Sequence, residues 1–406
     1  AAHRNGIRIM FDLAANHVHN EHAYWQEHFS CNDCTDDWFN AYALCKDANN
    51  WNDIPVSCWF AWYLPDLDFK NPDALHALVR NALTDVFKYD IDGYRVDAVK
   101  HVETAYLNHL VAGIERQVEH GSTSAADQFY LVGETFVGEW SNSCDNTANC
   151  AQWLIRKYVG PNLLDGQFDF PLYWQVLKTF ARNEATMADL AAMVNQSAGY
   201  YGSGALMSGF LGNHDVPRFI SHANGDIADQ WGNGAKEQGW TNPPASPSSY
   251  VPYQKLQLAM TFLSSIGGVP LVYYGDEIGL PGAGDPDNRR MMRFDGSLSS
   301  FETTTQDYMR KVVSLRQRHE ALRSSALTFL LSSDANVLVY GKSGSSEQAV
   351  VGLNRSSGSR TVTVSVSALG LSNGQVLTDA LNGGTITVSG SSVTLTLPPY
   401  TGALYF

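Results

Sequence analysis

Residues 91–101 read Ile-Asp-Gly-Tyr-Arg-Val-Asp-Ala-Val-Lys-His, a short apolar run that ends in charged residues. Other segments have the same form, and most of them are followed by a stretch with helical periodicity. The apolar runs are 7–12, 91–97, 129–134, 166–170, 209–213 and 270–275, and helix-period stretches include 73–89, 187–195 and 254–265. Nearly continuous apolar strands that alternate with helices predict a parallel sheet covered on both faces.

This pattern predicts an α/β barrel with two additional domains. A closed (β/α)8 barrel has about eight strands, so six predicted strands lead us to expect that the first two βα units are absent from this chain. The alternation breaks between 17 and 64, where cysteine, Asn, Asp and Trp cluster and predict a small inserted domain B. Strict alternation of β-branched and polar residues from about 324 predicts an all-β sandwich. The expected domains are the incomplete barrel over 1–16 and 65–323, domain B over 17–64 and domain C over 324–406.

Composition and charge exclude several classes of partner. The chain of 406 residues has a formal net charge of −14 and shows no basic stripe, so we expect no nucleic acid partner. No apolar run approaches the roughly 18 residues needed to cross a bilayer, so we expect no membrane partner. A hydrophobic fraction of 44% is ample for large cores.

The cysteines occur in close pairs, which favours disulfides and an oxidising compartment, hence a secreted or periplasmic protein. The pairs are Cys31/Cys34, Cys45/Cys58 and Cys144/Cys150. We expect Cys45–Cys58 and Cys144–Cys150 bridges. A Cys31–Cys34 bridge would close a short, strained loop, and a zinc or redox motif is the alternative for this pair, although no second CxxC supports zinc.

Acidic residues stand at the ends of several predicted strands, among them Asp97, Glu134 and Asp215. The carboxyl ends of parallel strands meet at one edge of a barrel, where such folds build their active sites. Glycoside hydrolysis needs one carboxylate as nucleophile and a second as proton donor and acceptor. A third can stabilise positive charge on the sugar. An isolated Asp after a strand is often only a helix cap, but the assembled set predicts a glycosidase site.

The segments around these residues resemble the short motifs of the α-amylase family, glycoside hydrolase family 13, and they occur in the same order. They are Asp-Leu-Ala-Ala-Asn-His at 12–17, Leu-Pro-Asp-Leu-Asp at 64–68, Gly-Tyr-Arg-Val-Asp-Ala-Val-Lys-His at 93–101, Gly-Glu-Thr at 133–135, Phe-Leu-Gly-Asn-His-Asp at 210–215, Tyr-Gly-Asp-Glu-Ile-Gly at 274–279 and Asp-Pro-Asp-Asn-Arg at 285–289. The resemblance implies a retaining α-amylase that cleaves internal α-1,4 bonds of starch and maltooligosaccharides.

The resemblance also assigns roles to individual residues. It implies that Asp97 is the nucleophile, Glu134 the general acid/base and Asp215 the stabiliser of the transition state. The implied substrate-binding residues are His17, Arg95, Lys100, His101, His214, Asp285 and Arg289, with Lys100 and His101 on the leaving-group side and Asp285 and Arg289 on the non-reducing side.

The resemblance implies a calcium ion as well. Its ligands would be the side chains of Asn16 and Asp66 and the carbonyl of His101, a set of oxygen donors that suits Ca²⁺. A further ligand is expected near 56–58, where no matching carboxylate aligns.

Two other functions stay open from the sequence. One is a transglycosylase or maltooligosaccharide-forming enzyme similar to the cyclodextrin glucanotransferases, and the other is a non-catalytic carbohydrate-binding relative. Residues 64–68 resemble α-amylases more than the cyclodextrin-hydrolysing branch, which favours the α-amylase. We expect a monomer whose partner is an α-glucan.

Overall fold

The predicted parallel strands form a sheet in the first half of the chain. The computed structural model describes residues 1–406 except 30–36, 123, 125–127, 140–149, 230–233 and 295. Its first strands are β1 (Met10–Leu13), β2 (Gly93–Val96), β3 (Tyr130–Gly133) and β4 (Gly166–Gln167). They pair in the order β1-β2-β3-β4, and each pairing is parallel, as predicted.

The chain divides into two units. Unit 1 comprises Ala1–Phe170 and Tyr200–Ser208, and unit 2 comprises Pro171–Gly199 and Gly209–Phe406. Unit 1 holds the parallel sheet and its core, and unit 2 holds a separate core under the C-terminal strands. In the described part of the chain, no helix has the length and apolar character needed to cross a membrane.

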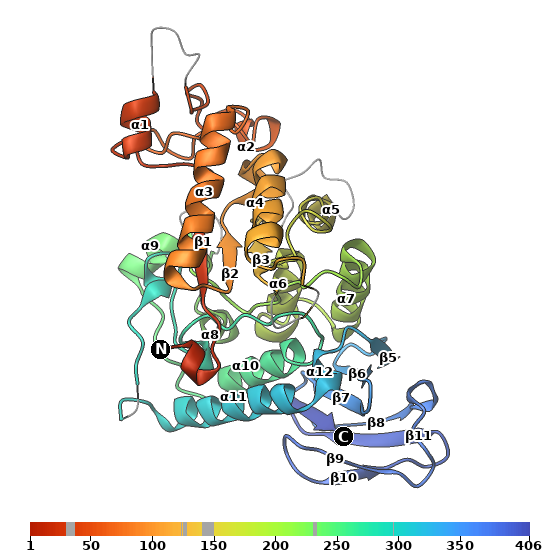
Figure 1. Cartoon of the computed structure of the whole chain (residues 1–406). Helices are drawn as coiled ribbons and strands as arrows, with labels where there is room; N and C mark the ends of the chain where they lie inside the picture. Colours follow the sequence, from red (N-terminus) through yellow and green to blue (C-terminus); the bar gives the residue numbers. More distant parts are fainter. Residues whose placement is uncertain (30–36, 123, 125–127, 140–149, 230–233, 295) are drawn as a thin grey trace. The chain divides into compact units, whose positions relative to one another are not determined.

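Two long helices of unit 1, α3 (Pro72–Tyr89) and α4 (Thr104–Gln117), lie side by side against the sheet (Figure 1). Asn71 caps α3, because its side-chain oxygen accepts hydrogen bonds from the backbone N–H groups of Asp73 and Ala74. Pro72 occupies the first turn, where its missing N–H has no cost. The predicted helix over 73–89 is confirmed. Unit 1 also contains η1 (His3–Asn5), η2 (Val99–His101) and the short α5 (Cys150–Arg156).

The inserted segment contains two short helices, α1 (Ala23–His28) and α2 (Asn50–Asp53). The expected Cys45–Cys58 disulfide is present, with an S–S distance of 2.06 Å. The expected Cys144–Cys150 bridge and the Cys31–Cys34 pair each involve residues outside the described part of the chain. Isolated bridges from His17 to Asp66 and from Phe39 to Leu67 join the insertion to the segment that precedes α3.

The helices after β4 are α6 (Phe170–Val176), continued by a π-helical turn at Leu177–Ala181, α7 (Met187–Tyr201), α8 (Phe219–Ala223), α9 (Gly234–Thr241), α10 (Val251–Leu263), η4 (Asp276–Ile278), η5 (Asp287–Arg289), α11 (Ser300–Arg318) and α12 (Glu320–Arg323). The helices predicted over 187–195 and 254–265 are confirmed. Regular strands predicted over 209–213 and 270–275 are wrong, because these residues form only a single parallel bridge between Phe210 and Leu271. Pro270 lacks an N–H group and cannot extend a ladder beside that bridge.

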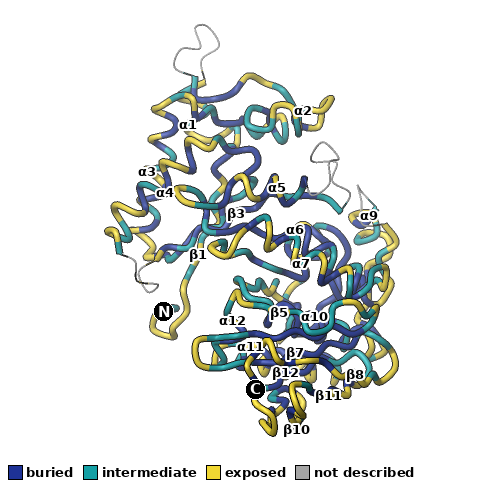
Figure 2. Tube along the Cα trace, turned by 90° about the vertical axis from the view of Figure 1, so that its right-hand side faces the viewer, coloured by how far each residue is buried: buried dark blue, intermediate teal, exposed yellow. Residues whose placement is uncertain are grey.

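The C-terminal strands form antiparallel sheets, as predicted. They are β5 (Leu327–Leu331), β6 (Val337–Ser343), β7 (Gln348–Asn354), β8 (Arg360–Ser365), β9 (Val376–Thr378), β10 (Thr385–Thr387), β11 (Ser392–Leu397) and β12 (Thr401–Tyr405), with η6 (Ser367–Leu369) after β8. The sheets run β12-β7-β6-β5, β11-β8 and β10-β9. Residues of β11 alternate between buried and exposed, and Figure 2 colours the chain by this burial. The buried residues of β11 share a core with residues of β6 and β7.

Candidate active site

Two candidate catalytic carboxylates follow neighbouring parallel strands of unit 1. Asp97 comes directly after β2 and Glu134 directly after β3. The N–H of Asp97 donates to the carbonyl of Leu13 at 3.0 Å, and the N–H of Glu134 donates to the carbonyl of Val96 at 2.9 Å. The backbone hydrogen bonds of the sheet therefore extend to both residues and fix the positions of their main chains. Two groups that act together in catalysis need such fixed positions.

The Arg95 guanidinium lies between these carboxylates. Its Nη1 is 2.6 Å from Asp97 Oδ1, and its Nη2 is 2.6 Å from Glu134 Oε2. Nη1 also contacts Asp12 Oδ1 at 2.8 Å. The resemblance groups Arg95 with the substrate-binding residues. In the structure, its guanidinium contacts carboxylates of this chain. We call Arg95, Asp97 and Glu134 the Arg95 clamp.

The Arg95 clamp is largely shielded from solvent. The side chains of Arg95 and Glu134 are 12% and 7% exposed, whereas that of Asp97 is 26% exposed. Burial works against the charged form of Arg95, but the neighbouring Glu134, Asp97 and Asp12 hold its pKa above its usual range. One carboxylate that solvent reaches and one that is nearly enclosed form the kind of pair that glycosidases use for attack and for proton transfer.

The predicted histidines of unit 1 lie beside aromatic rings of the inserted segment. His17 and His101 lie 5.4 and 4.7 Å from Phe60 between ring centroids. His101 Nδ1 is 2.7 Å from the carbonyl of Pro55, an arrangement in which Nδ1–H donates. Burial lowers the pKa of His101 to about 4, and it also lowers the pKa of His17 although Asp97 opposes the shift. Both rings are therefore neutral at physiological pH.

Lys100, predicted on the leaving-group side, is buried rather than extended into solvent. Its Nζ donates to Asn52 Oδ1 at 2.8 Å and lies 5.2 Å from the centroid of the Trp51 ring. Burial lowers the Lys100 pKa to about 8. Sequence reasoning assigned no role to Asn52, Trp51 or Phe60. The signal that could have found them is the cluster of aromatic residues and Asn in 17–64.

Unit 2 carries the remaining predicted residues in one exposed cluster around Arg289. The Arg289 Nε is 2.8 Å from Asp285 Oδ1, and its Nη2 is 3.6 Å from Asp215 Oδ1. His214 Nε2 lies 3.2 Å from Asp215 Oδ2. The side chains of this cluster are all between 36% and 47% exposed. We call Asp215, Asp285 and Arg289 the Arg289 cluster.

Two buried residues that the sequence did not single out hold the segment that carries the Arg289 cluster. Asn288 Nδ2 donates to the carbonyls of His214 and Val216, each at 2.9 Å. Arg218, only 1% exposed, donates from Nε to the carbonyl of Asn288 at 2.9 Å. Its guanidinium also lies 4.0 Å from the Tyr273 ring. These buried contacts fix the backbone of 285–289 against 214–216.

The three predicted calcium ligands meet in the interior of unit 1. Asn16 Nδ2 lies 2.5 Å from Asp66 Oδ1 and 2.9 Å from the carbonyl oxygen of His101. Asp66 is 1% exposed and has no ion-pair partner within the described ranges. Burial raises its pKa to about 8. A rotation of the Asn16 amide would bring its oxygen to face the same oxygens, so the residues fit a hard cation.

The structure also shows what lies where the further calcium ligand was expected. Asn40 Nδ2 is 2.8 Å from Asp66 Oδ2 and 3.4 Å from the carbonyl of Val56. Within 56–58, where the sequence offers no matching carboxylate, the backbone carbonyl of Val56 contacts the same Asn40 amide as Asp66. Asn40 was not predicted, and its sequence context offers no signal, because a single Asn after Phe39 resembles any polar residue of a loop.

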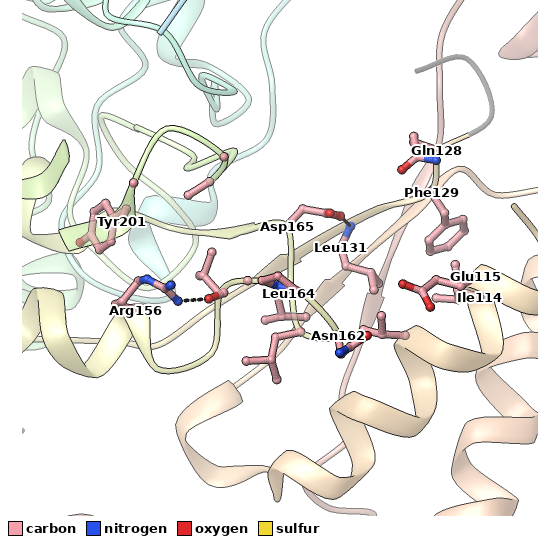
Figure 3. Close-up of a pocket in the computed structure, with 18 of the residues that line it drawn as sticks. Ile114, Glu115, Gln128, Phe129, Leu131, Arg156, Asn162, Leu164, Asp165 and Tyr201 are labelled. Carbon is pink, nitrogen blue, oxygen red and sulfur yellow. Dashed lines mark hydrogen bonds between the residues drawn. The ribbon is translucent and has the colours of Figure 1, made fainter. Parts of the chain in front are cut away.

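A cavity of about 520 Å³ lies elsewhere in unit 1, at the amino ends of β3 and β4 (Figure 3). Phe129, Leu131 and Asp165 line it, and none of the predicted site residues does. Its Asp165 Oδ2 accepts a hydrogen bond from the N–H of Leu131 at 2.8 Å, so this carboxylate ties the start of β3 to the start of β4. The candidate site stands at the opposite, carboxyl ends of the strands, as expected for a parallel α/β fold.

Comparison with known proteins identifies the family. The profile described as the alpha-amylase catalytic domain matches residues 1–336. The chain therefore belongs to the α-amylase family, glycoside hydrolase family 13. The predicted fold class, an α/β barrel fold with a C-terminal β domain, is confirmed by this match and by solved relatives.

Curated relatives have several activities. A cyclomaltodextrinase of Geobacillus thermopakistaniensis is 24% identical over 99% of this chain and 60% of its own length. A beta/alpha-amylase of Paenibacillus polymyxa is 26% identical over 98% of this chain and 29% of its own length. This chain thus spans less than two thirds of either relative. An alpha-amylase of Saccharomycopsis fibuligera is 26% identical over 96% of this chain and 68% of its own length.

Solved structures agree on the fold. An alpha-amylase from Geobacillus thermoleovorans, determined in complex with acarbose, is 25% identical with a TM-score of 0.78, and the match covers 99% of this chain and 78% of that one. A three-domain cyclomaltodextrin glucanotransferase, CldA, is 22% identical with a TM-score of 0.75, covering 100% of this chain and 76% of that one, and so supports the fold alone. The α-amylase family to which the chain belongs therefore includes relatives with several reactions on glucans, and the comparisons leave the specific reaction of this chain open.

Proposed function

We propose that this chain acts as an α-amylase, a retaining hydrolase of internal α-1,4-glucosidic bonds in starch and related glucans. The observation that carries the proposal is the Arg95 clamp, in which one guanidinium holds Asp97 and Glu134 at 2.6 Å each. Both acids stand at the carboxyl ends of adjacent parallel strands, so their separation is set by the sheet. Acarbose, an oligosaccharide analogue bound to a solved α-amylase relative, supports the substrate class.

The proposed reaction has two displacements. Asp97 attacks the anomeric carbon while Glu134 gives its proton to the glycosidic oxygen, so the C–O bond breaks and a glycosyl ester of Asp97 forms. Glu134 then takes a proton from water, which attacks the same carbon and releases Asp97. Arg95 keeps a positive charge beside both acids throughout the cycle. We assign Asp215 of the Arg289 cluster as the stabiliser of positive charge on the sugar.

Reducing-end release from soluble starch tests this proposal. Glu134→Gln and Asp97→Asn should each lower kcat by about a thousandfold or more, since each removes a group that acts in the reaction itself. Glu115→Gln on α4, an exposed carboxylate at the cavity far from β3's carboxyl end, is the matched control and should keep full activity. Turnover that survives both site substitutions would overturn the assignment of these residues, and a parent chain that binds maltooligosaccharides without turnover would favour a non-catalytic glucan-binding protein.

A second activity has specific support from the curated relatives, which include a cyclomaltodextrinase. Product analysis separates the candidates. Endo-acting hydrolysis releases a mixture of linear oligosaccharides from amylose, whereas a glucanotransferase forms cyclic products and a cyclomaltodextrinase prefers cyclic substrates. Cyclic products, or products of a single length, would replace the α-amylase proposal by one of these.

Calcium, oxidising surroundings and a monomeric state belong to the same proposal. Asn16, Asp66 and the His101 carbonyl would hold the calcium ion, which would supply the positive charge that the buried Asp66 lacks among the described residues. The Cys45–Cys58 disulfide supports a secreted or periplasmic location.

A further inference from the structure

A loop of the inserted segment is closed at its base and carries α2. The Cys45–Cys58 disulfide joins its two ends across 13 positions of sequence. Inside the loop, the N–H of Trp51 donates to the carbonyl of Cys45 at 3.1 Å, and Asn50 Nδ2 donates to the carbonyl of Leu44, the residue just before the loop, at 2.9 Å. We call residues 45–58 the disulfide loop. Its covalent closure and these bonds hold α2 in one position.

The disulfide loop contacts both residues that the family resemblance places on the leaving-group side. Asn52 accepts a hydrogen bond from Lys100 Nζ at 2.8 Å, and the Pro55 carbonyl is 2.7 Å from His101 Nδ1. The disulfide sulfurs and a ring nitrogen of His101 lie within 4.8 Å of one another. The sulfurs are bonded to each other, so this group is a packing contact and no thiolate metal site.

Lys100 and His101 are thereby removed from solvent, with 4% and 2% of their surfaces exposed. Trp51 covers them. Its ring centroid lies 4.3 Å from that of His101 and 5.7 Å from that of Phe60, and the Lys100 ammonium lies 5.2 Å from it. Trp51 itself remains 36% exposed. Of Trp51, Lys100 and His101, the indole therefore presents most of the surface that a ligand can reach.

We propose that Trp51 is the substrate-contacting residue on the leaving-group side, and that Lys100 is a positioning residue that acts through Trp51 and Asn52. This inference rests on the proposed function. An indole surface suits the C–H face of a glucose ring, because aromatic rings pack well against apolar faces that carry polar rims. Lys100 is 4% exposed and its ammonium already donates to Asn52, so it presents little surface to a sugar.

A pair of substrates isolates the leaving-group side. Maltoheptaose places glucose units on both sides of the bond that breaks, whereas 4-nitrophenyl α-maltotrioside cut at its aryl bond places only nitrophenol on the leaving-group side. Trp51→Ala should raise KM for maltoheptaose about tenfold, the size expected for one lost aromatic contact. Its kcat, and the release of nitrophenol from the aryl substrate, should stay within about twofold of the parent.

Phe87→Ala is the matched control. Phe87 is an exposed aromatic residue, 60% exposed, near the C-terminal end of α3, which leads into the amino end of β2. It lies at the opposite end of the strand from Asp97, so both substrates should behave as with the parent. Trp51→Phe keeps a ring of smaller area and should restore most of the affinity, which guards against misreading a folding defect in Trp51→Ala.

A double-mutant cycle tests the positioning role of Lys100. Lys100→Met removes the charge and keeps a side chain of similar length. If Lys100 acts through Trp51, the variant with both changes should match Trp51→Ala alone in its KM for maltoheptaose. Additive increases in KM would show that Lys100 binds sugar by itself and would overturn this part of the inference.

Failure of the inference and failure of the proposed function give different results. Equal effects of Trp51→Ala on both substrates, or no effect on either, would overturn the role of Trp51 while leaving the glycosidase intact. A parent protein that turns over neither substrate would remove the proposed function. Binding of maltoheptaose to the parent and to Trp51→Ala, followed calorimetrically, then decides the inference. Equal affinities overturn it, and an affinity about tenfold weaker in the variant supports it.

Discussion

The Arg95 clamp and the Arg289 cluster have the same composition, an arginine between two carboxylates, but they differ in burial. Arg95 and Glu134 are 12% and 7% exposed, whereas Arg289 and Asp215 are 45% and 38% exposed. Their distances differ in part, because Arg95 lies 2.6 Å from each of its acids, whereas Arg289 lies 2.8 Å from Asp285 and 3.6 Å from Asp215. Water screens the exposed pairs and weakens each contact, while the enclosed pairs are coupled strongly. The same residue types therefore predict different responses to substitution.

Between the two arginines, the larger expected effect is that of Arg95→Met. Removing the guanidinium leaves Glu134 buried and negatively charged beside Asp97, and breaking such a pair from one side is strongly destabilising. We expect kcat on starch to fall by about a hundredfold or more, together with a lower melting temperature. Arg95→Lys should recover only part of the loss, because an ammonium cannot bridge both carboxylates as a planar guanidinium does. Wild-type activity in Arg95→Met would contradict the coupling of the clamp.

The next effect concerns Asp66, a buried carboxylate that has no arginine of its own in the described part of the chain. Calcium removal by a chelator at neutral pH should lower the melting temperature on the order of 5 °C, because a ligand bound only to the folded state stabilises it. Asp66→Asn should lose most of this response while Asp68→Asn, an acid two residues away, should keep it. An unchanged melting transition in the chelated parent protein would argue against a calcium site.

A smaller effect tests burial inside unit 2. His222 in α8 is 5% exposed, and burial, aided by Arg182, lowers its pKa to about 3 from 6.5. Because the unfolded chain takes up this proton first, stability should be lost as the pH falls from about 6.5 toward 3. His222→Gln should flatten this dependence in urea unfolding between pH 6.5 and 4. The exposed His19→Gln is the control, and identical slopes for all three proteins would refute the prediction.

The smallest effect is expected from Arg289→Met in the exposed cluster. Its ion pairs are solvated, so their loss should change stability very little and raise KM on maltooligosaccharides about three- to tenfold. The measurement is a comparison with Arg95→Met under the same conditions, at low salt and at about 0.5 M salt, where exposed pairs are screened further. A loss as large as that of Arg95→Met would show that burial does not separate the two arginines.

The sequence by itself determined the architecture and the nearness of the carboxylates in unit 1. Apolar runs with helical stretches between them require parallel strands, and parallel strands bring residues such as Asp97 and Glu134 to one edge. The Cys45–Cys58 bridge followed from close spacing. The same patterns wrongly predicted regular strands at 209–213 and 270–275. An apolar run does not reveal whether its backbone will form a full hydrogen-bonded ladder with a neighbouring strand.

Only the tertiary structure determined which groups each charged side chain contacts. Carboxylates surround Arg95, while Trp51 and Asn52 contact Lys100, and Asn40 contacts Asp66. These contacts join side chains that are distant in sequence; Asn52 and Lys100, for example, are 48 positions apart. Local patterns report which surface a residue favours through its neighbours in the chain. The burial and the hydrogen-bond partners of a side chain depend on its surroundings in the folded protein. Burial and hydrogen bonds in turn determine its protonation state and which groups it can contact.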